Sequence, residues 1–120
     1  MRKQPQGWPT VVPRLVTSDV AGMVDFLKAV FDATGERRAG APAEIRIGDS
    51  LVMVSDGGGL RAPRAGFLYV YVADTDAAWR RAVAAGARTI EPPQDMPYGD
   101  RRATIEDPWG NLWQIATHGG

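Results

Sequence analysis

One pattern of secondary structure occurs twice along the amino-acid sequence, and this repeat limits the possible folds more than any other feature. Val11–Thr17 is short and rich in β-branched residues, as strands are, and Asp19–Phe31 carries apolar residues at helical spacing. Phe67–Gly86 again indicates a strand followed by a helix. Asp19 and Asp74 occupy equivalent positions, where a carboxylate can accept hydrogen bonds from the first turn of a helix. Each half is therefore expected to open with a strand and a capped helix.

Short strands are expected after each helix, because turn-forming residues divide both of the segments that follow. Gly48 and Asp49 indicate a tight turn in the first half, and Pro108 with Gly110 indicates another in the second. Residues 56–66 are rich in glycine and proline and are interpreted as a linker. The expected strands are Glu36–Ala39, Glu44–Ile47 and Leu51–Ser55 in the first half, and Arg88–Glu91, Arg101–Glu106 and Leu112–Thr117 in the second.

These elements predict an α+β fold of two βαβββ modules. One module cannot cover the apolar face of its own sheet, so the two are expected to pack together as a single domain. The expected architecture is a curved, mostly antiparallel, cup-shaped sheet with the helices outside. The domain would comprise a leader at residues 1–10, the first module at 11–55, the linker at 56–66 and the second module at 67–118.

Composition excludes several classes of function. The chain of 120 residues has no cysteine, which excludes disulfides, thiolate metal sites and a cysteine nucleophile. Its formal net charge is zero, so no bulk field would attract nucleic acid or an anionic membrane. Residues 1–7 are polar, and no apolar run approaches the length of a bilayer span. We therefore expect a cytoplasmic protein with no nucleic-acid or membrane partner.

The strand at residues 67–72 has two apolar faces of different character. Its aliphatic residues suit packing against a helix, whereas Phe67, Tyr69 and Tyr71 form an aromatic set on the other face. Aromatic rings with polar tips suit either the wall of a ligand cavity or a subunit interface, and both possibilities are open. Alignment of the last strands of the halves places Gln114 on the same face as the aromatic set.

The first strand contains a charged residue and a proline that need an explanation. Val12 and Arg14 lie on the face that matches the aromatic set. A guanidinium at a largely apolar wall needs a partner, which can be Glu106 or an anionic ligand group, and an internal ion pair is expected. Pro13 cannot donate a backbone hydrogen bond, so this strand is expected to have a free edge or a bulge. A homodimer is expected, partly because such an edge needs cover.

His118 is the single histidine of the chain, and it has two possible interpretations. It can be a catalytic base or a metal ligand, since it shares strand parity with Gln114. It can also belong to a frayed chain end, which is the outcome we expect because chain ends are commonly disordered. Glu44, Asp100 and Glu106 are carboxylates that can act as a base, but their spacing selects none of them. No catalytic residue is therefore assigned.

The paired modules and two motifs resemble a known superfamily. The hairpin "DPWGNLWQ" at residues 107–114 and the segment "YGDR" at 98–101 are similar to those of the vicinal oxygen chelate superfamily, in particular its PhnB-like members. That superfamily includes glyoxalase I, bleomycin-resistance proteins and extradiol dioxygenases. The resemblance covers about Val11 to His118. It implies that the cup holds a small ligand and, in the enzymes, also a divalent metal.

The same resemblance implies where metal ligands would lie. The four positions fall on Val12, Met53, Phe67 and Gln114. Valine and phenylalanine have no donor atom, and a thioether is a soft ligand. One amide is far short of the roughly three or four oxygen and nitrogen ligands that such a metal needs. No metal or other cofactor is therefore expected, and Gln114 is expected to hydrogen-bond a bound molecule or a tyrosine.

The leading hypothesis is a metal-independent protein of the drug-sequestering kind, which binds a small, partly aromatic or apolar molecule. One alternative is a metal-dependent lyase, isomerase or dioxygenase of the same superfamily, and another is a dimeric module without a ligand. The linker permits the modules to pair within one chain or to be exchanged between two chains. The expected ligand-binding residues are Val12, Arg14, Met53, Phe67, Tyr69, Tyr71 and Gln114.

Overall fold

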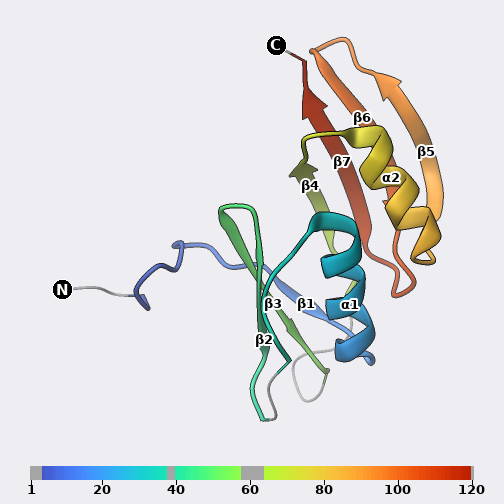
Figure 1. Ribbon diagram of the computed structural model, residues 1–120. Helices are drawn as coiled ribbons and strands as arrows, with labels where there is room; N and C mark the ends of the chain where they lie inside the picture. The colour runs from blue at the N-terminus through green and yellow to red at the C-terminus, as the bar shows by residue number, and fades with distance from the viewer. Residues whose placement is uncertain (1–3, 38–39, 58–63, 120) are drawn as a thin grey trace. The chain divides into compact units, whose positions relative to one another are not determined.

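The computed structural model describes residues 4–37, 40–57 and 64–119, which fold into two helices and two mixed sheets (Figure 1). The chain divides into two compact units, residues 1–28 with 32–64 and residues 29–31 with 65–120. Neither helix is long and apolar enough to cross a membrane. In chain order the elements are β1 (Arg14–Val16), α1 (Val20–Phe31), β2 (Ala43–Ile47), β3 (Ser50–Ser55), β4 (Phe67–Tyr71), α2 (Thr75–Ala84), β5 (Arg88–Asp95), β6 (Asp100–Glu106) and β7 (Leu112–His118).

Both helices begin at the predicted caps. The Asp19 carboxylate accepts a hydrogen bond from the Gly22 backbone N–H at 2.9 Å, and the Asp74 carboxylate accepts one from Ala77 at 3.1 Å. These bonds satisfy backbone donors that a helix leaves unpaired in its first turn. α1 ends at Asp32, whose φ of 55° is left-handed and stops the helical repeat.

The sheet of the first unit has the order β1-β3-β2, with β1 parallel and β2 antiparallel to β3. One face is apolar and closed to solvent, because Ile45 lies opposite Val52 and Ala43 lies opposite Val54, all of them buried. β1 is at the edge of this sheet, as Pro13 predicts.

The first module departs from the prediction in one strand. Glu36–Ala39 is not a strand in its described part, and residues 38–39 lie outside the described residues. A single bridge, formed by two backbone hydrogen bonds between Thr34 and Arg46, takes its place. Gly35 follows the bridge with a φ of 129°, a conformation that does not continue a strand. The first module is therefore βαββ with one bridge, whereas the second is βαβββ.

The sheet of the second unit has the order β4-β7-β6-β5, with β4 parallel to β7 and the other pairs antiparallel. α2 lies across one face of this sheet (Figure 1). Trp113, Ile105 and Ile115 are fully buried on that face, where Ile105 and Trp113 are cross-strand partners. Replacing a buried aromatic residue of this kind by alanine typically costs about 3–5 kcal/mol. The apolar core of the second unit therefore occupies the α2 side and leaves the opposite face open.

The predicted turn between β6 and β7 is organised by a buried carboxylate. Asp107 accepts hydrogen bonds from the backbone N–H groups of Trp109 and Asn111, both at 2.9 Å. It also accepts from the Asn111 amide at 3.0 Å and from the Trp113 indole at 2.8 Å. Gly110 completes the turn with a φ of 92°. The motif therefore fixes the register of the hairpin and the position of the core tryptophan together.

Candidate functional site

Three aromatic side chains project from β4 on the face of the second sheet that α2 does not cover. Phe67, Tyr69 and Tyr71 are 66%, 38% and 63% exposed, and we call them the aromatic face. The ring centroids of Tyr69 and Tyr71 are 5.4 Å apart with an interplanar angle of 58°. Strand alternation predicts that the three residues share a face, and the pairing of β4 with β7 agrees with it.

The hydroxyl groups of the aromatic face converge on one carboxylate. Tyr69 donates to Asp100 Oδ2 at 2.6 Å, and Tyr71 donates to the same oxygen at 3.0 Å. His118 Nδ1 lies 2.8 Å from the other oxygen, Oδ1. Asp100 is only 2% exposed, so its charge is held by these three contacts rather than by bulk water. They form a compact polar site at one end of the aromatic face.

The contacts around Asp100 set the protonation states of the site. Hydrogen bonds from Tyr69 and then His118 lower the pKa of Asp100. The pKa of Tyr69 is raised, first by burial and then by its hydrogen bond to Asp100. The pKa of Tyr71 is raised first by its hydrogen bond to Asp100. At neutral pH the carboxylate is therefore ionised and accepts, while both tyrosines are neutral and donate.

A chain of hydrogen bonds continues from Tyr69 across the open face. The hydroxyl groups of Tyr69 and Tyr98 are 3.2 Å apart, and Arg102 Nη1 donates to Tyr98 at 3.0 Å. Arg102 Nη2 donates to Glu91 at 3.2 Å, and Thr104 donates to the same Glu91 oxygen at 2.6 Å. Because Tyr69 gives its proton to the carboxylate, the Tyr98 hydroxyl must donate to Tyr69 and accept from Arg102. The hydrogen bonds therefore all donate in one direction, from Arg102 through Tyr98 and Tyr69 to Asp100.

Gln114 occupies the position that the sequence predicts, between two groups of this face. It is the neighbour of Tyr69 across β4 and β7, and of Thr104 across β7 and β6. Its Nε2 is 3.5 Å from Thr104 Oγ1, a long contact, and no described residue bonds its Oε1. Trp113 points to the opposite, buried face. Gln114 thus presents an amide oxygen that a bound molecule can use.

The placement of His118 corrects the expectation of a frayed end. His118 is the last residue of β7 and pairs with Asp100 of β6. Glu106 pairs with Leu112 at the start of the same hairpin, so counting equally far along both strands aligns Asp100 with His118. The "DPWGN" turn carried this signal, because its register fixes every pair in the ladder. The sequence interpretation missed this pairing and also Arg102, whereas it named Tyr98 as an aromatic residue that could line the mouth of the cup or be covered by a partner subunit.

The ligand positions predicted in the first unit lie on its own sheet. Met53 is half-buried between Arg14 of β1 and Glu44 of β2, and Val12 precedes β1 and is also half-buried. Arg14 is exposed and borders a hollow of about 520 Å³ within the first unit. Whether any of these residues contacts a ligand stays a prediction.

Glu106, the candidate partner that the sequence offers for Arg14, binds Arg88 within the second unit, at 2.7 Å. The reason is strand register, since Arg88 lies directly opposite Glu106 on the neighbouring strand β5.

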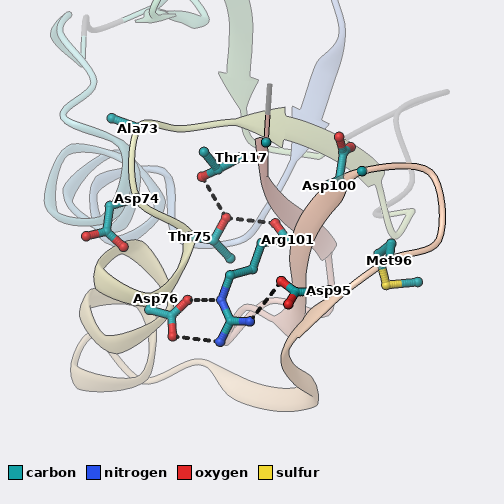
Figure 2. A pocket seen from close by; sticks show the side chains of 11 residues that line it. Ala73, Asp74, Thr75, Asp76, Asp95, Met96, Asp100, Arg101 and Thr117 are labelled. Carbon is teal, nitrogen blue, oxygen red and sulfur yellow. Dashed lines mark hydrogen bonds and ion pairs between the residues drawn. The ribbon is translucent and has the colours of Figure 1, made fainter.

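A hollow of about 330 Å³ lies beside the first turn of α2, and its polar groups bind one another (Figure 2). Arg101 forms two hydrogen bonds with Asp76, at 2.6 and 3.0 Å, and one with Asp95 at 3.1 Å. Thr75 donates to the Arg101 carbonyl oxygen at 2.9 Å and lies 2.8 Å from Thr117 Oγ1. These contacts tie α2 to β6 and β7, and they leave few groups for a ligand.

The residues at the superfamily's metal positions do not fit a divalent cation. Phe67 offers no donor atom beside Gln114, and Met53 offers only a thioether in the first unit. Within the described residues, no three His, Cys, Asp or Glu side chains are grouped so that they could hold a metal ion. On the open face, the Tyr69 and Tyr71 hydroxyl groups and His118 Nδ1 contact Asp100, and the Gln114 amide nitrogen contacts Thr104.

The glyoxalase/bleomycin resistance protein/dioxygenase superfamily model matches residues 10–115. The chain belongs to this superfamily. An uncharacterized protein of Mycobacterium bovis, Mb0911c, is 32% identical over 124 residues, which cover 89% of this chain and 82% of that protein. TioX from Micromonospora sp. ML1 has a similar crystal structure, with a TM-score of 0.78, 30% identity, and coverage of 92% of this chain and 98% of TioX.

Other superfamily structures share the fold at lower identity. The fosfomycin resistance protein FosX of Mesorhizobium loti has a TM-score of 0.69 and 21% identity, with 91% of each chain covered. These similarities confirm the α+β glyoxalase/bleomycin-resistance fold that the repeat and the final hairpin predict. The PhnB-like subfamily stays a prediction.

Proposed function

We propose that this superfamily member binds a small, partly aromatic or apolar molecule on its aromatic face without a metal, as a drug-sequestering protein would. The observation that carries the proposal is the exposure of Phe67 and Tyr71, 66% and 63%, on either side of Tyr69. Contiguous apolar groups on one open face of a small protein usually mark a binding surface. A flat, largely apolar molecule is the occupant that suits such a row of rings.

The tyrosines of the aromatic face are held in place before any ligand binds. Both donate to Asp100 Oδ2, Tyr69 at 2.6 Å and Tyr71 at 3.0 Å. Ordering a flexible side chain on binding costs about 0.5–1.5 kcal/mol, and prior fixation of the rings reduces that cost. Gln114 adds a polar group that can orient the ligand. The face therefore combines apolar area with a few positioned polar atoms, the usual makeup of a small-molecule site.

The donor atoms support a site that works without a metal. At the family's ligand positions in the second unit, Phe67 contributes a ring and Gln114 a single neutral amide. A lyase, isomerase or dioxygenase of the usual superfamily kind would need several more hard donors there. A phenyl ring at such a position extends the apolar wall instead.

Titration with a neutral aromatic probe, naphthamide, tests the binding proposal. Calorimetry of the wild-type chain in EDTA is expected to show saturable one-to-one binding. Phe67→Ala and Tyr71→Ala are each expected to weaken it roughly tenfold, because each removes a stacked ring. Val83→Ala removes an exposed apolar side chain from α2 and is the matched control, with unchanged affinity. Equal binding by all four proteins would overturn the proposal.

Titration with metal ions tests the part of the proposal that says the site works without a metal. The EDTA-treated chain is titrated with Zn²⁺, Mn²⁺ and Ni²⁺, and no stoichiometric site of micromolar or tighter affinity is expected. Such a site, abolished by Gln114→Ala, would overturn the metal-free assignment and favour a metal-dependent enzyme. Gln94→Ala, which changes an exposed glutamine on β5, is the control for nonspecific binding.

A second copy of the chain is the alternative occupant of the aromatic face, and one observation favours it. β4 lies at the edge of its sheet and contains neither charge nor proline, so it lacks the usual protection against pairing with another chain. Sedimentation of wild-type protein and Tyr71→Lys distinguishes the occupants. A dimer that the substitution dissociates, together with no naphthamide binding, would support cover by a second copy.

A further inference from the structure

One ring nitrogen of His118 is unused and lies beside the aromatic face. Its Nδ1 is 2.8 Å from Asp100 Oδ1, while the side chain is 64% exposed. An ionised carboxylate can only accept, so Nδ1 carries the proton and donates it. In neutral imidazole this leaves a lone pair on Nε2, for which no partner exists among the described residues. A buried carboxylate behind an exposed imidazole thus orients a single proton-accepting atom towards solvent.

We propose that His118 is the polar anchor of the aromatic face and that it selects molecules carrying an acidic hydroxyl group, namely a carboxylic acid or a phenol. The inference rests on the proposed function, because it names the chemical class of molecule that the same face binds. No covalent step is involved. One proton is shared between Nε2 and the ligand oxygen, either as neutral imidazole with the neutral acid or as imidazolium with its anion.

Asp100 orients the imidazole for this contact. Its carboxylate accepts from Nδ1 at 2.8 Å, which fixes the ring and its tautomer, as the aspartate behind a histidine does in other proton-transfer sites. Two further donors, Tyr69 and Tyr71, hold the same carboxylate. The carboxylate, and with it the imidazole, is therefore positioned before a ligand binds.

The position of the imidazole relative to the rings follows from shared contacts. His118 and Tyr71 bind the two oxygens of one carboxylate, and His118 is two residues beyond Ala116, the partner of Tyr71 on β7, on the same face of the sheet. Gly99 packs against the imidazole, and a methyl group there would lie 3.5 Å from its Cε1 atom. A 2.9 Å backbone hydrogen bond from Gly119 to Gly99 holds the end of β7 against this loop. The imidazole therefore lies on the same face as the aromatic side chains, one same-face position beyond the partner of Tyr71.

The other charged side chains of the open face are paired, Arg88 with Glu106 and Arg102 with Glu91, although Arg102 Nε is buried without a partner among the described residues. Arg102 donates to Tyr98 and Glu91, and its side chain is only 16% exposed. Glu91 in turn accepts from Thr104. On the far side of β6, Arg101 is engaged by two carboxylates. Among the titratable side chains around Asp100, His118 is thus exposed and has a ring nitrogen without a partner among the described residues.

Two probes of the same shape separate this inference from the function on which it rests. Naphthoate carries the acid, and naphthamide is its neutral analogue. The wild-type chain is expected to bind naphthoate about tenfold more tightly, the effect of one charge-assisted hydrogen bond. His118→Gln is expected to abolish that preference, so that the ratio of the two affinities falls to about one. Arg88→Gln removes an exposed cation from the same sheet and is the control that keeps the preference.

The ring nitrogens of His118 give a second readout. Nitrogen NMR is expected to show a larger change of the Nε2 signal on adding naphthoate than on adding naphthamide. Nitrogen NMR of the single histidine is expected to show the Nδ1–H tautomer in the neutral form. The Nε2–H tautomer would overturn the inference without any ligand.

The outcomes of the probe experiment are distinct. Equal binding of both probes by the wild-type chain overturns the anchor and leaves the proposed function standing. A naphthoate preference that survives His118→Gln also overturns it. Naphthoate binding that depends on His118 but not on Phe67 or Tyr71 supports the anchor and overturns the aromatic-face function. Failure of both probes to bind overturns both proposals.

Discussion

Asp100 and His118 face each other across the β6–β7 ladder, and a 2.8 Å hydrogen bond joins Oδ1 to Nδ1. The carboxylate is buried, and the imidazole is mostly exposed. This relationship connects the interior of the second unit with its open face. Substitutions of the buried Asp100 are therefore expected to change stability, and substitutions of the exposed His118 are expected to change ligand binding.

Acidification is expected to destabilise the fold through Asp100. Its pKa is lowered in the folded state by hydrogen bonds from Tyr69 and then His118, so its contribution is present above the unfolded value of about 4. The contribution is lost as pH falls through the lower, folded value. Asp100→Asn should therefore show a smaller loss of unfolding free energy between neutral pH and about pH 3. Urea unfolding at both pH values measures it, and Asp25→Asn on α1 should behave like wild type.

Alkaline pH is expected to act through Tyr69 and Tyr71. The pKa of each is raised, for Tyr69 mainly by burial and for Tyr71 mainly by its hydrogen bond to Asp100. Their stabilisation is complete below the unfolded value of about 10 and is lost as pH rises through the folded values. Ultraviolet titration of tyrosinate should show delayed ionisation in the folded chain. Tyr71→Phe should remove one delayed group, and an unchanged titration curve would contradict the assignment.

Asp107→Ala is expected to destabilise the chain by about 3–5 kcal/mol, because it leaves several buried N–H groups without an acceptor. The carboxylate accepts from Trp109, Asn111 and Trp113, and is itself only 3% exposed. Chemical denaturation measures the effect. Asp49→Ala, in the hairpin turn of the first unit, is the matched control, with an expected change within about 0.5 kcal/mol. A comparable loss of unfolding free energy at both positions would show that the buried hydrogen bonds to Asp107 do not stabilise the chain more than a turn residue does.

Gly35→Ala is expected to cost more than about 2 kcal/mol, combining a left-handed backbone with a steric clash. At this position φ is 129°, and an added Cβ would lie 2.2 Å from the Glu44 carbonyl oxygen. Gly48→Ala provides the comparison, because φ at Gly48 is 57° but an added Cβ would have no atom within 4 Å. A loss of about 1 kcal/mol in unfolding free energy is expected there, from the backbone conformation alone. Thermal unfolding of both variants tests the difference. Equal losses of stability in the two variants would indicate that the backbone near Glu44 moves away from the added methyl group at no cost in free energy.

The local elements of the fold were predictable because short-range physics determines them. The capping carboxylates Asp19 and Asp74 and the "DPWGN" turn act within a few residues of their own position. Alternation along β4 placed Phe67, Tyr69 and Tyr71 on one face, and the repeat placed Gln114 with them. The one strand that failed, at 36–39, follows Gly35, where a left-handed residue interrupts extended backbone.

The candidate site was less predictable, because its contacts join residues distant in sequence. Asp100 is 31 positions from Tyr69 and 29 from Tyr71 on a strand of another hairpin, whereas the register of the β6–β7 hairpin already sets its pairing with His118. Alternation assigns a residue to a face, but it does not say which strand lies next to which. The same limit explains Glu106, which was one candidate partner for Arg14 and binds Arg88, its direct cross-strand neighbour.

The sequence by itself determined the repeated modules, the helix starts, the hairpin turn and the aromatic character of one strand face. Each depends on local backbone preference or on the period of apolar residues. Only the tertiary structure decided that β7 lies between β4 and β6. That order brings the tyrosines of β4 and His118 of β7 to one buried carboxylate on β6, because a side chain can bond only what the neighbouring strands place within about 3 Å of it.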